Sequence, residues 1–329
     1  MNLKFSFAIS TLALLLTACS APPPTVAPKP TPAPLTDVSV VMGYIPNVQF
    51  APWFVAEKKG YFAAAGINVK YNWGFEIDGI KLVGANQADF AMLGGDQIIQ
   101  ARSQNIPLVY VANYYNSFPI SIFSLKEKNI QSPADLVGKR VGLPAFFGAT
   151  YTGWRALLYS ANIKETDIQT RDIGFTQVAA VTQGIVDAAA GYSNNEPVQL
   201  KSIGKEINVI NVGDYSRLVG IGLATNEKTI AEKSPIVRGM VAALLRGLQD
   251  TVNNPAEALD ITIARLPEAG TDRRMTEAIL KSTIELWKSP TFGYVDPSAW
   301  AASYKFMLDA GFITNEFDIT KGYTNKFLQ

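Results

Sequence analysis

The sequence predicts an α/β protein of two lobes, each a mixed, mostly parallel sheet flanked by helices. Short β-branched strands alternate with helical stretches across short polar junctions, a pattern typical of sheets covered on both faces. The alternation begins again near residue 120. In addition, residues 84–91 are similar to residues 182–189, because each segment ends a helix and enters a buried strand directly after an aspartate. These three observations indicate two lobes of related construction.

The first lobe is predicted from residues 37–119 together with 222–329. Its strands are expected at residues 38–42, 67–73, 90–93 and 108–112, and its first helices at 49–59, 77–85 and 96–104. A long strand at 218–225 returns the chain to this lobe. Four more helices are expected after it, at 235–253, 256–265, 272–287 and 298–310.

The second lobe is predicted from residues 120–221. Its strands are expected at residues 120–124, 141–143, 170–173, 188–192 and 207–210, and its helices at 132–135, 151–161 and 177–185. Ser132 and Pro133 form an ordinary helix start, with serine as the cap and proline in the first turn.

The N-terminus has the pattern of an export signal. Lys4 precedes an apolar run at residues 5–16, and Leu-Thr-Ala then leads to Cys19. This end resembles the bacterial lipoprotein box, which implies a signal peptide at 1–18 and a lipid on Cys19. The proline-rich segment through residue 36 is expected to be an extended tether. The protein is thus expected at the cell membrane, lipid-anchored and facing the extracytoplasmic side. An ordinary export signal with an unrelated cysteine is the alternative.

Composition restricts the chemistry. The chain has no histidine and one cysteine, which removes the Ser-His-Asp arrangement, a spare thiol nucleophile and nearly every catalytic zinc site. A carboxylate-only or lysine-only enzyme stays open. The 29 basic and 28 acidic residues nearly cancel, so no nucleic-acid partner is indicated. We expect a monomer that binds a small molecule, without cofactor, metal or catalytic residue.

Four motifs carry a family resemblance. They are residues 43–56 with 59–62 and 66–69, residues 89–91, residues 130–142, and residues 184–187 with 191–197. Together they resemble the type II extracytoplasmic solute-binding proteins of ABC importers, in the branch of nitrate, sulfonate and thiamine-pyrimidine-precursor binders. The resemblance covers residues 38–287. It implies the type II periplasmic-binding-protein fold, a ligand in the interlobe cleft, and permease and ATPase subunits as partners.

The segments after the strands are expected to supply the ligand contacts, because they collect at the carboxyl ends of the sheets. The candidates are Asn47, Gln49, Trp73, Phe75, Asp96, Tyr115, Thr150, Tyr192, Asn194 and Glu196. Each has a structural alternative. Asn47 suits a turn and Gln49 a helix start, Trp73 could pack under its own loop, and Asp96 or Thr150 could be a helix N-cap. Glu196 could face solvent before Pro197.

The predicted ligand is a flat, essentially neutral ring. The aromatic residues expected in the cleft are Trp53, Trp73, Phe75, Tyr114, Tyr115, Phe146 and Tyr192, and Arg155 is the one basic residue nearby. Glu196 would repel an anion. The resemblance leaves riboflavin and the thiamine pyrimidine precursor, and Gln49 favours riboflavin because precursor-binding relatives have histidine near this position. A sulfonate or nitrate binder is a further alternative. A pyrimidine-synthesising enzyme of the same fold would need the histidine and cysteines that are missing.

Overall fold

The computed structural model describes residues 34–328. The predicted signal peptide, Cys19 and nearly all of the predicted tether lie outside the described residues. The tether was predicted to extend through residue 36, but the first strand already begins at Thr36, which pairs with Ile67. No helix in the described part of the chain is long and apolar enough to cross a membrane.

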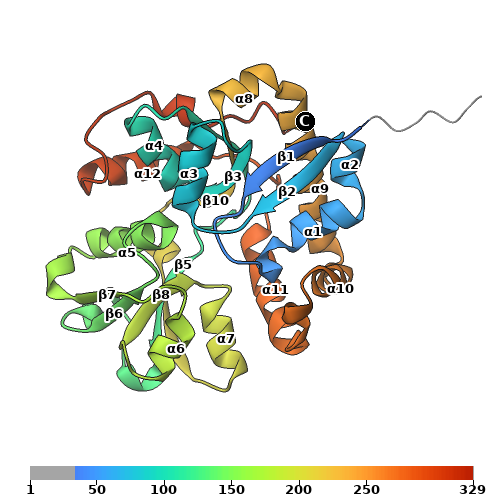
Figure 1. Ribbon diagram of the computed structural model, residues 1–329. Helices are drawn as coiled ribbons and strands as arrows, with labels where there is room; N and C mark the ends of the chain where they lie inside the picture. Colours follow the sequence, from blue (N-terminus) through green and yellow to red (C-terminus); the bar gives the residue numbers. More distant parts are fainter. Residues whose placement is uncertain (1–33, 329) are drawn as a thin grey trace, which may run out of the picture. The chain divides into compact units, whose positions relative to one another are not determined.

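The first sheet has five strands in the order β2-β1-β3-β10-β4. Their bounds are β1 Thr36–Val41, β2 Ile67–Asn72, β3 Phe90–Gly94, β4 Leu108–Asn113 and β10 Ile221–Asn226. β1 pairs in parallel with β2 and β3, whereas β10 is antiparallel to both β3 and β4. Four strands therefore run in one direction and β10 runs against them. We call the part of the molecule built on this sheet lobe I (Figure 1).

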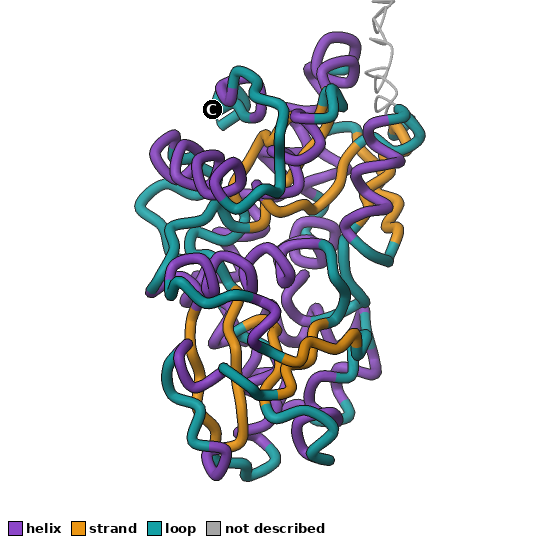
Figure 2. Tube along the Cα trace, turned by 90° about the vertical axis from the view of Figure 1, so that its left-hand side faces the viewer, coloured by secondary structure: helices purple, strands orange, loops and turns teal. Residues whose placement is uncertain are grey.

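The second sheet repeats this plan in the order β7-β6-β8-β5-β9. Its strands are β5 Ile120–Leu125, β6 Arg140–Leu143, β7 Gln169–Asp172, β8 Ala188–Tyr192 and β9 Ile207–Asn211. Here β5 is the strand that is antiparallel to both neighbours. The part built on this sheet is lobe II, and Figure 2 shows the two groups of strands one above the other. The predicted α/β class, with two mixed and mostly parallel sheets, is confirmed.

The chain crosses between the sheets twice, at residues 114–119 and 212–220. In each sheet the antiparallel strand is the first one after a crossing. The predicted lobe boundaries at 119–120 and 221–222 stay a prediction.

Twelve α-helices are assigned among residues 34–328, most of them against the sheets. Their bounds are α1 Ala51–Lys58, α2 Tyr61–Ala64, α3 Glu76–Gly84, α4 Gly95–Ser103, α5 Gly148–Ser160, α6 Gln177–Thr182, α7 Glu196–Ser202, α8 Glu227–Glu232, α9 Ser234–Asn253, α10 Pro255–Arg265, α11 Arg273–Trp287 and α12 Pro297–Asp309. The long α9 buries Val237, Val241, Leu244 and Leu248 at helical spacing, which fits its packing along α1.

Several elements differ from the sequence prediction, and the short helices α2 and α8 were not expected at all. The helix expected at 49–59 is a 3-10 turn, η1 (Val48–Phe50), followed by α1, because Pro52 suits the first turn of a new helix. Pro197 likewise starts a helix, α7, where a loop was expected. The strand expected from residue 218 begins only at Ile221, and residues 218–220 belong to the second crossing.

Candidate ligand-binding site

Two adjoining cavities lie between the lobes, where loops after the strands of both sheets meet. The tyrosine cavity, about 30 Å³, is lined by Met42, Gly43, Tyr44, Gln49, Phe50, Glu76, Met92, Tyr114, Tyr115, Tyr192, Asn195 and Ile221. The phenylalanine cavity, about 50 Å³, is lined by Gly43, Tyr44, Phe75, Glu76, Pro144, Ala145, Phe147, Gly148, Ala149, Thr150, Phe175, Gln177, Tyr192 and Glu196. The two share four lining residues, and we call them together the cleft.

The lobes are closed over this cleft. Both cavities are far smaller than the roughly 300–1,000 Å³ of an ordinary small-molecule site. Aromatic side chains from the two lobes meet across it: Phe75 lies 5.0 Å from Phe175 and 5.7 Å from Phe147 between ring centroids, and Tyr44 lies 4.9 Å from Phe175. A flat ligand can therefore enter only when these rings separate, either by lobe opening or by rotation of the side chains.

Polar contacts also join the lobes. The Ala149 N–H, at the start of α5 in lobe II, donates to Glu76 Oε2 in lobe I at 2.9 Å. Thr152 Oγ1 donates to Asp96 Oδ2 at 2.5 Å one turn further along α5. Asn195 Nδ2 lies 3.4 Å from Tyr44 Oη. The start of α5 is thus covered by carboxyl groups from lobe I.

Glu196 lies at the beginning of α7 and is almost fully buried. Its Oε2 accepts the backbone N–H of Tyr192 at 2.8 Å, and its Oε1 accepts from Asn195 Nδ2 at 3.2 Å. Burial raises the pKa of Glu196 to about 7, although these hydrogen bonds oppose the shift. Near neutral pH this carboxyl can therefore accept a hydrogen bond from a ligand or, when protonated, donate one.

Glu76 is a second buried carboxyl of the cleft, and the sequence prediction missed it. Burial and the nearby charge of Asp96 raise its pKa to about 8, against the effect of the Ala149 N–H. Burial also raises the pKa of Asp96. An acidic residue in the first turn of a helix is ordinary, so nothing in the sequence marked Glu76; its importance depends on the contact with α5.

Gln49 offers an unused donor to the cleft. The side chain is buried, its Oε1 lies 3.5 Å from the Tyr115 hydroxyl, and its Nε2 has no hydrogen-bond partner within the protein. A buried amide without a partner is costly, so a ligand oxygen at this position would satisfy it.

Seven of the ten predicted contact residues lie at the cleft or directly beneath it. Gln49, Phe75, Tyr115, Thr150, Tyr192 and Glu196 line the cavities. Asp96 lies behind the lining, through its bond with Thr152. Neither Asp96 nor Thr150 is an N-cap, because α4 is preceded by Gly94 and α5 by Phe147.

The other three predicted residues do not line the cavities. Asn47 caps η1 by accepting the Gln49 N–H. Trp73 lies behind the wall, stacked on Tyr71 and 5.2 Å from Phe50. Asn194 is fully buried, and its Nδ2 donates to Thr283 on α11 at 2.8 Å, so it ties lobe II to that helix.

Three of the other residues expected in or near the cleft also lie elsewhere. Trp53 is in the core of lobe I, where it stacks on Phe62. Phe146 is exposed and Phe147 takes the lining position next to it. Arg155 pairs with Glu165 and lies over the Phe312 ring, and it lines neither cavity. Neighbouring residues of a loop point in different directions, which the sequence alone did not resolve.

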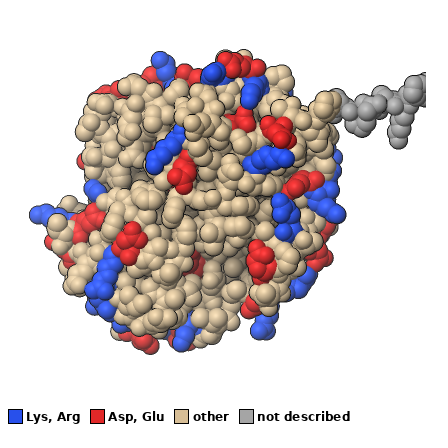
Figure 3. Space-filling view, in the orientation of Figure 1, with Lys and Arg blue, Asp and Glu red and all other residues tan. Residues whose placement is uncertain are grey.

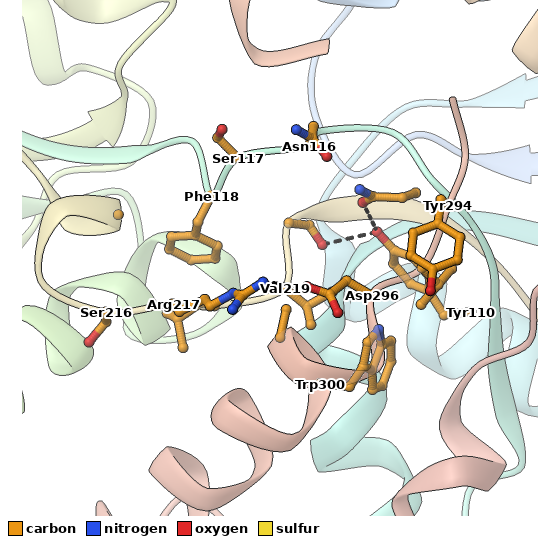
Figure 4. A pocket seen from close by; sticks show the side chains of 16 residues that line it. Tyr110, Asn116, Ser117, Phe118, Ser216, Arg217, Val219, Tyr294, Asp296 and Trp300 are labelled. Carbon is orange, nitrogen blue, oxygen red and sulfur yellow. Dashed lines mark hydrogen bonds and ion pairs between the residues drawn. The ribbon is translucent and has the colours of Figure 1, made fainter. Parts of the chain in front are cut away.

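A cavity of about 320 Å³ lies at the two crossings rather than between the sheet ends. Figure 4 shows Asn116, Ser117 and Phe118 from the first crossing above Arg217 from the second, whose guanidinium pairs with Asp296. Because the crossings form its walls, movement of the lobes would reshape this cavity. It lacks the converging ends of several strands that the cleft has.

Fold and cleft define a two-lobed binding protein, and the comparisons agree. The model of the NMT1/THI5-like family matches residues 47–258, and the chain belongs to this family. It is 38% identical to a riboflavin-binding protein, RibY, of Chloroflexus aurantiacus, over 96% of this chain and 95% of that protein.

Two further relatives have different named functions. A formylaminopyrimidine-binding protein of Halalkalibacterium halodurans is 30% identical over 81% of this chain and 83% of the relative. A 4-amino-5-hydroxymethyl-2-methylpyrimidine phosphate synthase of Legionella pneumophila is 25% identical, over 88% and 92%. Among solved structures, the periplasmic aliphatic sulphonate-binding protein SsuA of Escherichia coli has a TM-score of 0.72 at 16% identity, with 90% of this chain and 100% of that chain covered. That likeness supports the fold.

Proposed function

We propose that this protein is the solute-binding component of an ABC importer and that it captures riboflavin. The observation that carries the proposal is an aromatic, cation-free cleft between two lobes. Eight aromatic residues line it: Tyr44, Phe50, Phe75, Tyr114, Tyr115, Phe147, Phe175 and Tyr192. No lysine or arginine is among the lining residues. Such walls suit a flat ring, since aromatic stacking adds about 0.5–1.5 kcal/mol beyond burial.

Polar groups in the cleft are of the kinds that the edge of an isoalloxazine ring can pair with. That edge carries one N–H between two carbonyl groups. Glu196 can accept the N–H, and the unpartnered Nε2 of Gln49 can donate to a carbonyl oxygen. The 38% identity to a named riboflavin-binding protein supports the same ligand.

The same observations support the alternative functions less well. A sulfonate or nitrate would lack a basic partner among the lining residues. On the face of the molecule drawn in Figure 3, charges of both signs are scattered without a basic patch. A synthase of the family type would need a histidine, and the chain has none. A pyrimidine is the second candidate ligand, because one relative is named as a formylaminopyrimidine-binding protein.

We also propose that the protein is exported and held at the membrane by a lipid on Cys19. The basic start, the apolar run and the small residues before this cysteine support the proposal. In this position the binding protein would face the extracytoplasmic side and deliver its ligand to the permease.

Titration with riboflavin tests the ligand. Binding between the tyrosine rings is expected to quench flavin fluorescence. It should also lower emission from Trp287, which stacks on Tyr115 at 6.3 Å. Formylaminopyrimidine and taurine serve as competitors, and mass spectrometry identifies any molecule carried through purification. Unchanged flavin emission, with a thermal shift from the pyrimidine alone, would reject riboflavin and leave the importer role standing.

A further inference from the structure

The N-terminus of α5 opens directly into the cleft. Gly148, Ala149 and Thr150 line the phenylalanine cavity, and the preceding Phe147 has no side chain that could cap the helix. Free N–H groups and the helix dipole make such a position attractive to a phosphate or sulfonate group. Here, however, the Ala149 N–H already donates to Glu76 Oε2 at 2.9 Å.

The Glu76 side chain has little free space around it, and we call the position that it occupies the seat of Glu76. A Cβ atom at Gly148 would lie 3.0 Å from Glu76 Oε2, and one at Gly43 would lie 3.1 Å from Glu76 Cγ. Both glycines have positive φ, +78° and +73°. The side chain is buried between them. Glu76 therefore occupies a place that is shaped for its carboxyl group on both sides.

We propose that Glu76 makes the cleft select the uncharged vitamin, because its carboxyl group takes the α5 N-terminus that a ligand phosphate or sulfonate would need. The inference rests on the proposed function and adds the class of ligand: a ring compound without an anionic group. Glu76 acts here as a specificity residue, and no other lining residue contacts the first N–H groups of α5 through a carboxyl group.

The surrounding charges act in the same sense. The titratable groups near Glu76 are Asp96 on α4, Tyr192 on β8, Tyr44 after β1 and Glu196 on α7. None of them is basic. A phosphorylated ligand would meet these carboxyl groups without a compensating cation, and it would bind best when Glu76 is protonated. Discrimination against phosphate should therefore grow as pH rises from about 7 to 9.

The test compares riboflavin with riboflavin 5′-phosphate by calorimetry. The full-length wild type, Glu76→Gln and Glu206→Gln are measured, the last being an exposed glutamate of lobe II. The wild type and Glu206→Gln should prefer riboflavin, increasingly so at higher pH. Glu76→Gln keeps an acceptor for Ala149 but loses the charge, so its preference for riboflavin should fall about tenfold. The preference should also depend less on pH than in the wild type, because only Glu196 and Asp96 then remain as buried carboxyl groups near the ligand. Equal affinities in the wild type, or an unchanged ratio in Glu76→Gln, would overturn the inference.

A second measurement does not depend on the vitamin. Inorganic phosphate at millimolar concentration should raise the melting temperature of Glu76→Ala, in which the α5 N-terminus is free, and leave the wild type unchanged. If this happens while riboflavin fails to bind, the ligand assignment is wrong and the role of Glu76 stands. Equal shifts in both proteins, or none in the variant, would overturn the role of Glu76 whatever the vitamin does.

Discussion

Glu196 illustrates how a single side chain in this cleft acquires its chemistry. Removal from water favours its neutral form, whereas the Tyr192 N–H and the Asn195 amide favour the carboxylate. The balance places its pKa at about 7, so a small change in surroundings changes its charge. A ligand N–H that points at this group would favour the carboxylate.

Replacing Glu196 by glutamine should weaken riboflavin binding by about 1–3 kcal/mol at pH 8, because a charged acceptor becomes a neutral one. Calorimetry measures the loss. Glu206→Gln, an exposed change in the same lobe, should bind like the wild type. Equal affinities of Glu196→Gln and the wild type would remove Glu196 from the site.

Sequence reasoning located the loops of the site better than its side chains. Gln49, Tyr192 and Glu196 were predicted because segments after strands collect at one edge of a sheet, and the positions of the strands along the chain can be predicted from the sequence. Glu76 was missed because its role comes from α5, 73 residues away. Trp73 was predicted to contact the ligand but lies behind the wall of the cleft. The sequence could not separate these two positions, because a half-buried tryptophan and one that stacks on a ligand look the same in it.

At the scale of elements, several helices of this fold begin beside the cleft. α3, α4, α5 and α7 all begin at or close to the cleft. Their boundaries were predicted to within a few residues, except for α7. There Pro197 was taken as part of a loop, although it lies in the first turn of the helix.

Gly148→Ala tests the start of α5, and Gly138→Ala is its matched control. Both glycines have positive φ, +78° and +75°, so both changes should cost about 1 kcal/mol of folding stability from backbone strain. Nothing lies within 4 Å of a Cβ at Gly138, whereas at Gly148 it would press on Glu76. Only Gly148→Ala should therefore lower riboflavin affinity, by about tenfold. Similar affinities for the two variants would show that the seat of Glu76 is unimportant for binding.

At the scale of the whole molecule, the two crossings are the segments that connect the lobes. They are the covalent links between the sheets, so a hinge movement would be confined to residues 114–119 and 212–220. The helix α11 adds a noncovalent link, because Thr283 accepts from Asn194 of lobe II. Ligand entry and release would follow from bending at these few positions.

Cys19→Ser should release the protein from the membrane while its riboflavin affinity stays unchanged. The described fold begins near residue 34, and the segment after Cys19 is rich in proline and poor in core-forming residues. Membrane fractionation and calorimetry on the released protein measure the two properties. Retention in the membrane fraction would contradict the lipid anchor, and weaker binding would show that the segment contributes to the cleft.

The order of strands also has a consequence for how the chain reaches its fold. All five strands of lobe II come from one stretch, Ile120–Asn211. In lobe I, β10 lies between β3 and β4, and it is synthesised only after lobe II is complete. Until then β3 and β4 have no strand between them, and each presents an unpaired edge. Lobe II is therefore expected to form first, and the last strand to arrive joins the two separated parts of the other sheet.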